Sequence, residues 1–199
     1  MVEQGGRQVP ASVAQKLYAA TDVIAARGLG RTKIEDIATA SGVPKATLYY
    51  YFSGKDEILS FLLKDSLGAL AREVATAADT AGSGRDRLAA VIAVQVGHTM
   101  LRPGSSRALV GDLGRAIRLP ELATAVKQVF YEPIAKLLVA GAQDGSLRSV
   151  ADPNSAAISI FGAVMVTAML HNVVDSDASV NDVSDGVIDL LINGLLPSA

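Results

Sequence analysis

The chain has 199 residues, of which half are hydrophobic and 19% are charged, and its formal net charge is −2. This length and composition favour one large or two smaller helical domains with a substantial core, and they argue against long disordered stretches. The absence of cysteine excludes disulfides, thiol catalysis and every cysteine-based zinc or iron–sulfur site.

Two stretches bear on where the protein resides. Residues 1–11 have no apolar core behind a positive flank, unlike a secretory signal. The most apolar stretch, residues 156–170, is shorter than the ~20 apolar residues that a membrane-spanning helix needs. We therefore expect a cytoplasmic protein with no membrane partner, and we interpret residues 156–170 as a buried helix.

Charge is distributed unevenly along the chain. Residues 1–55 hold seven basic and four acidic side chains, a net charge of +3, which leaves −5 for the remainder. A mildly basic head on an acidic body is the asymmetry expected when only the head contacts nucleic acid.

The first helices are predicted from apolar spacing and capping residues. Val13, Leu17, Ala20 and Ile24 share one face of a helix that can end at Gly28. The residues from Thr32 to Glu35 form a capping box for a second helix, which would stop at Gly42. A third short helix is predicted for residues 44–51.

The remaining chain repeats the helical pattern. A second capping box at residues 53–56 opens a long connecting helix, residues 56–81. Further helices are predicted between the breaks at 82–84 and 102–104, and over 108–117, 120–142, 154–173 and 182–195. With no trustworthy alternating β pattern, the sequence predicts an all-α fold of about nine helices.

Residues 33–52 combine a capped helix, a three-residue turn built on Gly42 and a second short helix, which is helix-turn-helix geometry. In such units the second helix enters the DNA major groove. Tyr49 to Phe52 could instead be an aromatic core cluster, but four consecutive aromatics on a helix point around its circumference. At least one or two of them must therefore face solvent or a partner.

Ile34, Asp36, Ile37, Ala38, Gly42, Val43, Thr47, Leu48, Tyr49, Tyr51, Phe52 and Lys55 stand in the pattern I-x-D-I-A-x-x-x-G-V-x-x-x-T-L-Y-x-Y-F-x-x-K. This pattern resembles the DNA-binding signature of the tetracycline-repressor (TetR) family. The resemblance implies an N-terminal arm and three-helix DNA-binding domain (1–55), a connecting helix (56–81) and a larger C-terminal helical domain for effector binding and dimerisation (82–199). The DNA-contacting residues that it implies, with Leu48 and Phe52 as core, are Thr32, Lys33, Lys45, Ala46, Thr47, Tyr49, Tyr50 and Lys55.

The resemblance also implies partners. Family members dimerise through their last two helices, and residues 154–173 are rich in small side chains that allow close helix packing. A two-fold dimer would place its recognition helices ~34 Å apart on a roughly palindromic operator.

A mainly apolar pocket would take a small, largely apolar effector. Its candidate lining residues are His98, Phe130, Tyr131, Phe161, Met165, Met169 and His171, although residues of these types at helical spacing are more often ordinary core or a hydrogen-bonded histidine. The two histidines would need long-range assembly to bind a metal, so we expect neither a metal nor a cofactor.

These features together predict a sequence-specific repressor that a ligand releases from DNA. An activator, or a regulator controlled by a protein partner, would have the same fold. An all-helical enzyme is the alternative from another class, but no nucleophile and base stand at a diagnostic spacing. A sequence-independent DNA-packaging protein conflicts with the acidic overall charge.

Overall fold

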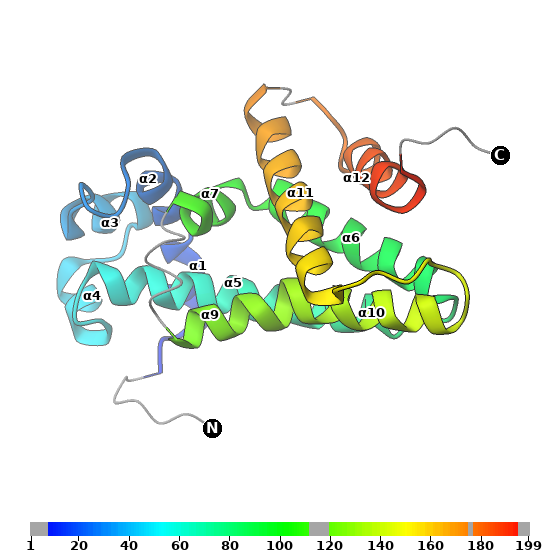
Figure 1. Cartoon of the computed structure of the whole chain (residues 1–199). Coiled ribbons are helices and arrows are strands. Elements are labelled where there is room, and N and C mark those ends of the chain that lie inside the picture. Colours follow the sequence, from blue (N-terminus) through cyan, green and yellow to red (C-terminus); the bar gives the residue numbers. More distant parts are fainter. Residues whose placement is uncertain (1–7, 112–119, 175–176, 195–199) are drawn as a thin grey trace. The chain divides into compact units, whose positions relative to one another are not determined.

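The computed structural model describes residues 8–111, 120–174 and 177–194, and all regular secondary structure within these ranges is helical (Figure 1). The chain divides into two compact units. The first unit comprises residues 1–66 and 104–122, and the second comprises 67–103 and 123–199. The division falls inside the predicted connecting helix.

In the first unit, the helix predicted to run up to Gly28 is two helices, α1 (Ala11–Leu17) and α2 (Ala20–Arg27). The Thr21 hydroxyl donates to the carbonyl of Tyr18 at 2.6 Å and lies beside the break. Leu17, Ala20 and Ile24 are nevertheless buried together, as their spacing predicted. The prediction of one uninterrupted helix was wrong, because spacing does not reveal a turn that keeps the same face buried.

The helix α3 (Ile34–Ser41) has a cap that differs from the predicted one. The Asp36 carboxylate accepts from the backbone N–H of Lys33 at 2.9 Å, so the capping carboxylate lies one residue later than the predicted Glu35, and the Lys33 side chain makes no reciprocal cap bond. Glu35 instead forms an ion pair with Lys45 at 2.5 Å. The helix ends at Gly42, whose φ of 65° is the left-handed conformation that glycine adopts without strain.

The helices α4 (Lys45–Tyr51) and α5 (Lys55–Ala78) follow. Glu57, rather than the predicted Asp56, accepts hydrogen bonds from the backbone N–H of Ser53 at 2.6 Å and from its hydroxyl at 2.7 Å. The first unit also contains α7 (Pro103–Gly111) from Gly104 onward. Residues 112–117 of the predicted 108–117 helix lie outside the described residues.

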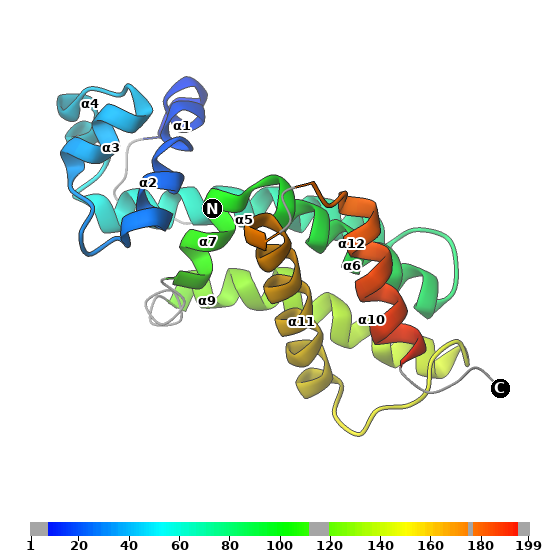
Figure 2. The same cartoon turned by 90° about the horizontal axis from the view of Figure 1, so that it is seen from above.

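In the second unit, α6 (Gly84–Leu101) is packed by three other helices: α10 (Glu132–Gln143), α11 (Pro153–Val174) and α12 (Val180–Ile188) (Figure 2). Gly84 and Gly141 allow α6 and α10 to meet, because a Cβ at Gly84 would lie 2.4 Å from the backbone of Gly141.

Two helices of this region contain π-helical segments. Lys127–Tyr131 joins α9 (Pro120–Val126) to α10, and Asp189–Asn193 continues α12. The fully buried Gln95 side chain donates to the carbonyl of Val129, inside the first of these segments, at 3.1 Å. Counting α1 with α2, and each π segment with the helices it continues, the described ranges contain the nine helices that the sequence predicted.

Residues 156–170 are helical, as predicted, but the prediction that this helix is buried is right for only one of its faces. The apolar part of α11, Pro153–Asn172, is long and apolar enough to cross a membrane, but only 28% of its 18-residue apolar window is buried. Ile158, Val166 and Leu170 are 54%, 53% and 55% exposed. One such helix is weak support for a membrane span, and a large exposed apolar face is typical of a surface that contacts a partner.

Candidate nucleic-acid interface

The helix-turn-helix consists of α3, a turn at Gly42 to Pro44, and α4. Ile37 from α3 and Leu48 from α4 are 0% and 1% exposed, and Val43 in the turn is 3% exposed. These three side chains fix the angle between the two helices. The opposite face of α4 is left available to a partner.

The aromatic run at the end of α4 divides between inside and outside. Phe52 is buried and packs on Phe61 with ring centroids 5.5 Å apart. Tyr49 and Tyr50 are 58% and 54% exposed, and Tyr50 meets Tyr51 edge to face at 4.9 Å. The prediction that part of this run faces outward is confirmed, and the interpretation of the whole run as core is wrong.

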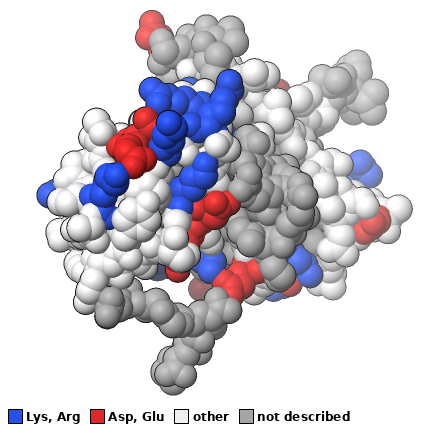
Figure 3. All heavy atoms as spheres, turned by 90° about the vertical axis from the view of Figure 1, so that its left-hand side faces the viewer, with Lys and Arg blue, Asp and Glu red and all other residues white. Residues whose placement is uncertain are grey.

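The face that carries α3 and α4 bears a group of lysine and arginine side chains with fewer acidic ones between them (Figure 3). Acidic side chains of α3 pair with two cations of the first unit: Asp36 lies 3.0 Å from Arg27, and Glu35 lies 2.5 Å from Lys45. The hydrogen bond from Lys45 lowers the pKa of Glu35 and raises that of Lys45. Because both pairs are open to water, DNA phosphates can compete for the cations.

The structure places the predicted DNA-binding residues in three settings. Thr47 is half-buried on α4, and Lys55 is half-buried at the start of α5. Thr32 is completely buried. The exposed ones are Lys33, Lys45, Ala46, Tyr49 and Tyr50.

Thr32 and Lys55 have structural partners. The Thr32 hydroxyl donates to the carbonyl of Gly28 at 2.9 Å. The Lys55 ammonium donates to the carbonyls of Gly30 and Thr32 at 3.0 and 2.8 Å. These bonds hold the loop that leads into α3. The prediction that the Thr32 side chain contacts DNA is withdrawn, and Lys55 has one N–H left for a phosphate.

The sequence prediction did not include Arg27 and Arg31, which are exposed just before α3. Arg31 Nε donates to the carbonyl of Arg27 at 3.0 Å. Their signal in the sequence was the positive charge of residues 1–55, which does not identify individual contacts.

The predicted effector-binding residues lie in the second unit, where several form packed core. Phe161 contacts Phe130 and Tyr131 at ring-centroid distances of 4.8 and 5.0 Å. The Thr99 hydroxyl lies 3.4 Å from the Met165 sulfur. Met169 and His171 are half-buried on α11.

His98 is 6% exposed, and its Nδ1 lies 2.7 Å from Arg102 Nη1 and 3.9 Å from the Glu73 carboxylate. Burial, followed by the positive charge of Arg102, lowers the pKa of His98 to about 4. The imidazole is therefore neutral near pH 7, where it accepts a hydrogen bond from Arg102 instead of forming an ion pair with Glu73.

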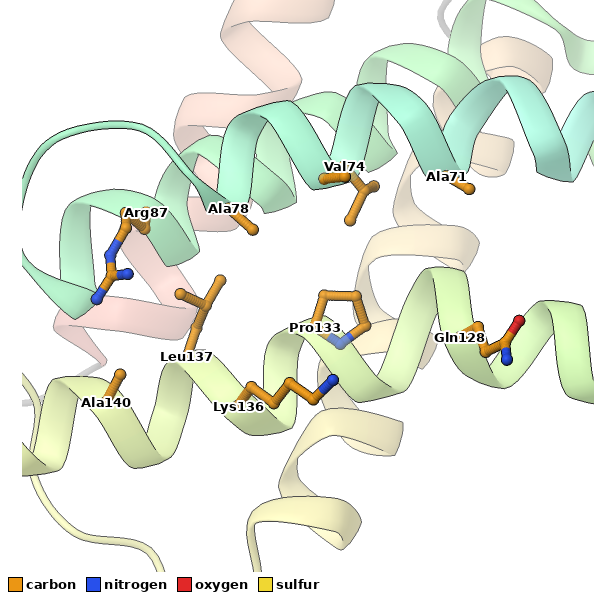
Figure 4. Close-up of a pocket in the computed structure, with 10 residues that line it drawn as sticks. Ala71, Val74, Ala78, Arg87, Gln128, Pro133, Lys136, Leu137 and Ala140 are labelled. Carbon is orange, nitrogen blue, oxygen red and sulfur yellow. The ribbon is translucent and has the colours of Figure 1, made fainter.

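A pocket of about 360 Å³ lies in the second unit between α5 and α10 (Figure 4). Val74 and Ala78 of α5 point toward Leu137 and Pro133 of α10. None of the predicted effector residues lines this pocket, which the sequence prediction missed because alanines carry no chemical signal. The lining residues are Ala71, Val74, Ala75, Ala78, Arg87, Gln128, Pro133, Lys136, Leu137 and Ala140.

Known proteins resemble this chain both in the helix-turn-helix region and over nearly its whole length. A family model described as bacterial regulatory proteins, tetR family, matches residues 17–60. The fatty acid metabolism regulator protein of Bacillus subtilis (strain 168) is 26% identical over 184 residues, which cover 91% of this chain and 94% of that protein. The transcriptional repressor KstR2 of Rhodococcus jostii (strain RHA1) is 32% identical over 144 residues, 67% of this chain and 66% of the repressor.

Solved structures show the same fold. The fatty acid degradation regulator FadR from Bacillus halodurans superposes with a TM-score of 0.75 at 22% identity, over 95% of this chain and 98% of that one. FadR from Bacillus subtilis in complex with stearoyl-CoA gives a TM-score of 0.68 at 25% identity, over 92% of this chain and 98% of that one.

Proposed function

Because this chain is a DNA-binding transcriptional regulator of the TetR family, we propose that it is a repressor which a long-chain fatty acyl-coenzyme A releases from its operator. The observation that supports DNA recognition is the exposed face of α4. Leu48, on the opposite face of this helix, is buried and fixes its orientation. The effector class is supported by similarity over nearly the whole chain to a fatty acid metabolism regulator, and by the stearoyl-CoA bound to a structural relative.

In this proposal α4 enters the major groove. Thr47 offers a hydroxyl and a methyl group to base edges, and the small Ala46 lets the helix approach a thymine methyl. Tyr49 and Tyr50 donate to phosphates, while Lys33 and Lys45 supply positive charge. Base contacts would determine which DNA sequence is bound, and phosphate contacts would fix the position and orientation of the protein on the duplex.

We further propose a homodimer formed through α11 and α12. Ile158, Val166 and Leu170 follow one another at spacings of eight and four residues, so they form one exposed apolar stripe along α11. Leu190, which is 48% exposed, adds apolar surface just beyond α12. Pairing two copies through these surfaces would remove the stripe from water and present two α4 helices to a palindromic site in the cytoplasm.

The test begins with selection of bound sequences from a random DNA pool in about 0.15 M salt, which suppresses non-specific phosphate binding. We expect a palindrome to be enriched, and Thr47→Ala protein to bind it more weakly than wild type. Thr76→Ala, an exposed change on α5, is the matched control. If folded protein enriches no sequence, the recognition role of α4 is wrong.

The effector is tested next by titrating stearoyl-CoA into the protein–operator complex and following fluorescence anisotropy. Release at micromolar concentration is the expected result, with coenzyme A alone as the control. Operator binding that stearoyl-CoA leaves unchanged would rule out this effector while preserving the assignment as a DNA-binding regulator.

A further inference from the structure

We propose that the pocket between α5 and α10 is the effector site, in which Arg87 and Lys136 hold the negatively charged end of a long-chain amphipathic molecule. This inference rests on the proposed function for the effector class. It adds which surface binds the effector and which chemical group the protein recognises.

The walls of the pocket suit an unbranched hydrocarbon chain. On α5, Ala71, Val74 and Ala78 form one wall, and Pro133 and Leu137 form the wall on α10 (Figure 4). Alanine leaves open space where a larger side chain would close the gap between the helices. The volume of about 360 Å³ lies within the range of roughly 300–1,000 Å³ found for small-molecule sites.

The charge at the pocket is entirely positive among the residues that line it in the described part of the chain. Arg87 enters from α6, and its Nε is buried without a hydrogen-bond partner in the described structure. Leaving a buried charged donor unsatisfied is costly, so an acceptor supplied by a ligand would stabilise it.

The nearby carboxylate of Asp144 does not fill this role. It accepts from the backbone N–H groups of Gly84 and Ser146 at 2.7 and 2.9 Å. The hydrogen bond with the Ser146 side chain lowers the pKa of Asp144 most, followed by the hydrogen bonds from the backbone N–H groups of Gly84 and Ser146, and the charge of Arg87 contributes less than any of them. Lys136, exposed on α10, adds a second cation to the pocket wall.

An apolar cleft with two cations is complementary to a molecule with an apolar tail and an anionic head. A neutral hydrocarbon or steroid would leave both cations unmatched. The carboxylate of a free fatty acid and the phosphates of an acyl-coenzyme A share the required chemistry.

The position of the pocket on α5 links it to DNA binding. The same helix begins at Lys55, which holds the loop before α3, and continues without interruption to Ala78 at the pocket. A ligand that fits only when α5 and α10 move apart would favour a conformation with α5 displaced. Such a ligand lowers operator affinity in proportion to its preference for that conformation.

The test measures binding of stearoyl-CoA to the full-length protein by isothermal titration calorimetry, without DNA. The first variant, Arg87→Gln/Lys136→Gln, removes both pocket cations. Its control, Arg72→Gln/Lys127→Gln, removes the same amount of charge from exposed sites outside the pocket. We expect the pocket variant to lose on the order of tenfold or more in affinity and the control to stay within about twofold of wild type.

A second pair of variants tests the cleft itself. Ala75→Trp fills the pocket from its exposed rim, whereas Thr76→Trp adds the same bulk to the neighbouring exposed position outside it. Only Ala75→Trp is expected to abolish binding. Circular dichroism and operator binding without ligand establish that each variant is folded.

Stearate and coenzyme A, titrated separately, identify the group that the cations hold. Stearate binding that depends on Arg87 and Lys136 would assign a carboxylate, and coenzyme A binding with the same dependence would assign phosphates. The proposal is overturned if both pocket variants bind stearoyl-CoA like wild type, or if wild type binds none of the three molecules. The random-pool selection of operator DNA is independent of either result, so failure of the pocket does not imply failure of the DNA-binding function.

Discussion

The buried imidazole of His98 makes the stability of the second unit depend on pH. In the folded protein the pKa of His98 is lowered from 6.5 to about 4, first by burial and second by the charge of Arg102. Below pH 6.5 the unfolded chain takes up a proton that the folded chain does not. The free energy of unfolding therefore falls as the pH falls, until the folded protein also binds the proton near pH 4.

The size of this effect follows from the two pKa values. The full shift corresponds to about 3 kcal/mol at 1.36 kcal/mol per pKa unit. Between pH 7 and pH 5 the expected loss is about 2 kcal/mol. The paired carboxylates of Glu57, Asp86 and Asp144 contribute little in this window, because their ordinary pKa values are 4.5, 3.8 and 3.8 and their folded values are lower still.

The assay is urea unfolding of wild type and His98→Asn at pH 7 and pH 5, followed by circular dichroism. Asparagine can accept the Arg102 hydrogen bond at the position of Nδ1 but does not titrate, so the variant should lose the pH dependence in this range. His171→Asn is the matched control and should retain it. If the free energy of unfolding changes by the same amount between pH 7 and pH 5 in wild type and in His98→Asn, the assignment of the proton uptake to His98 is refuted.

Four further predictions concern the DNA-binding face and the dimer. Leu48→Ala should destabilise the protein by about 2–5 kcal/mol in thermal unfolding, because it empties a fully buried site. Lys55→Met should lower the Tm, because it removes the donor to the Gly30 and Thr32 carbonyls; an unchanged Tm would contradict that role. Tyr50→Ala should weaken operator binding in fluorescence anisotropy while the Tm stays unchanged. Val166→Asp should change the protein from dimer to monomer in analytical ultracentrifugation. Wild-type protein that is monomeric at micromolar concentration would refute the α11 interface.

The sequence alone predicted the helix-turn-helix because its signals are local. Gly42 permits the left-handed turn that ends α3, and Leu48 and Phe52, which the resemblance implied as core, are buried. Four consecutive aromatics could not all be core on any helix, which identified an outward face before any contact was known. Nearest-neighbour geometry along a helix was sufficient for these conclusions.

The tertiary structure decided which polar residues are available to a partner. Thr32 and Lys55 were both predicted to contact DNA, but Thr32 is buried with its hydroxyl bonded to the Gly28 carbonyl, and Lys55 donates to the carbonyls of Gly30 and Thr32. The sequence likewise could not predict the exposed stripe of α11 or the alanine-lined pocket, because a run of apolar residues does not show which side of a helix packs against other helices. Residues far apart in sequence, such as Ala78 and Leu137, line one cavity only after the helices pack, and burial and pairing are properties of that packing.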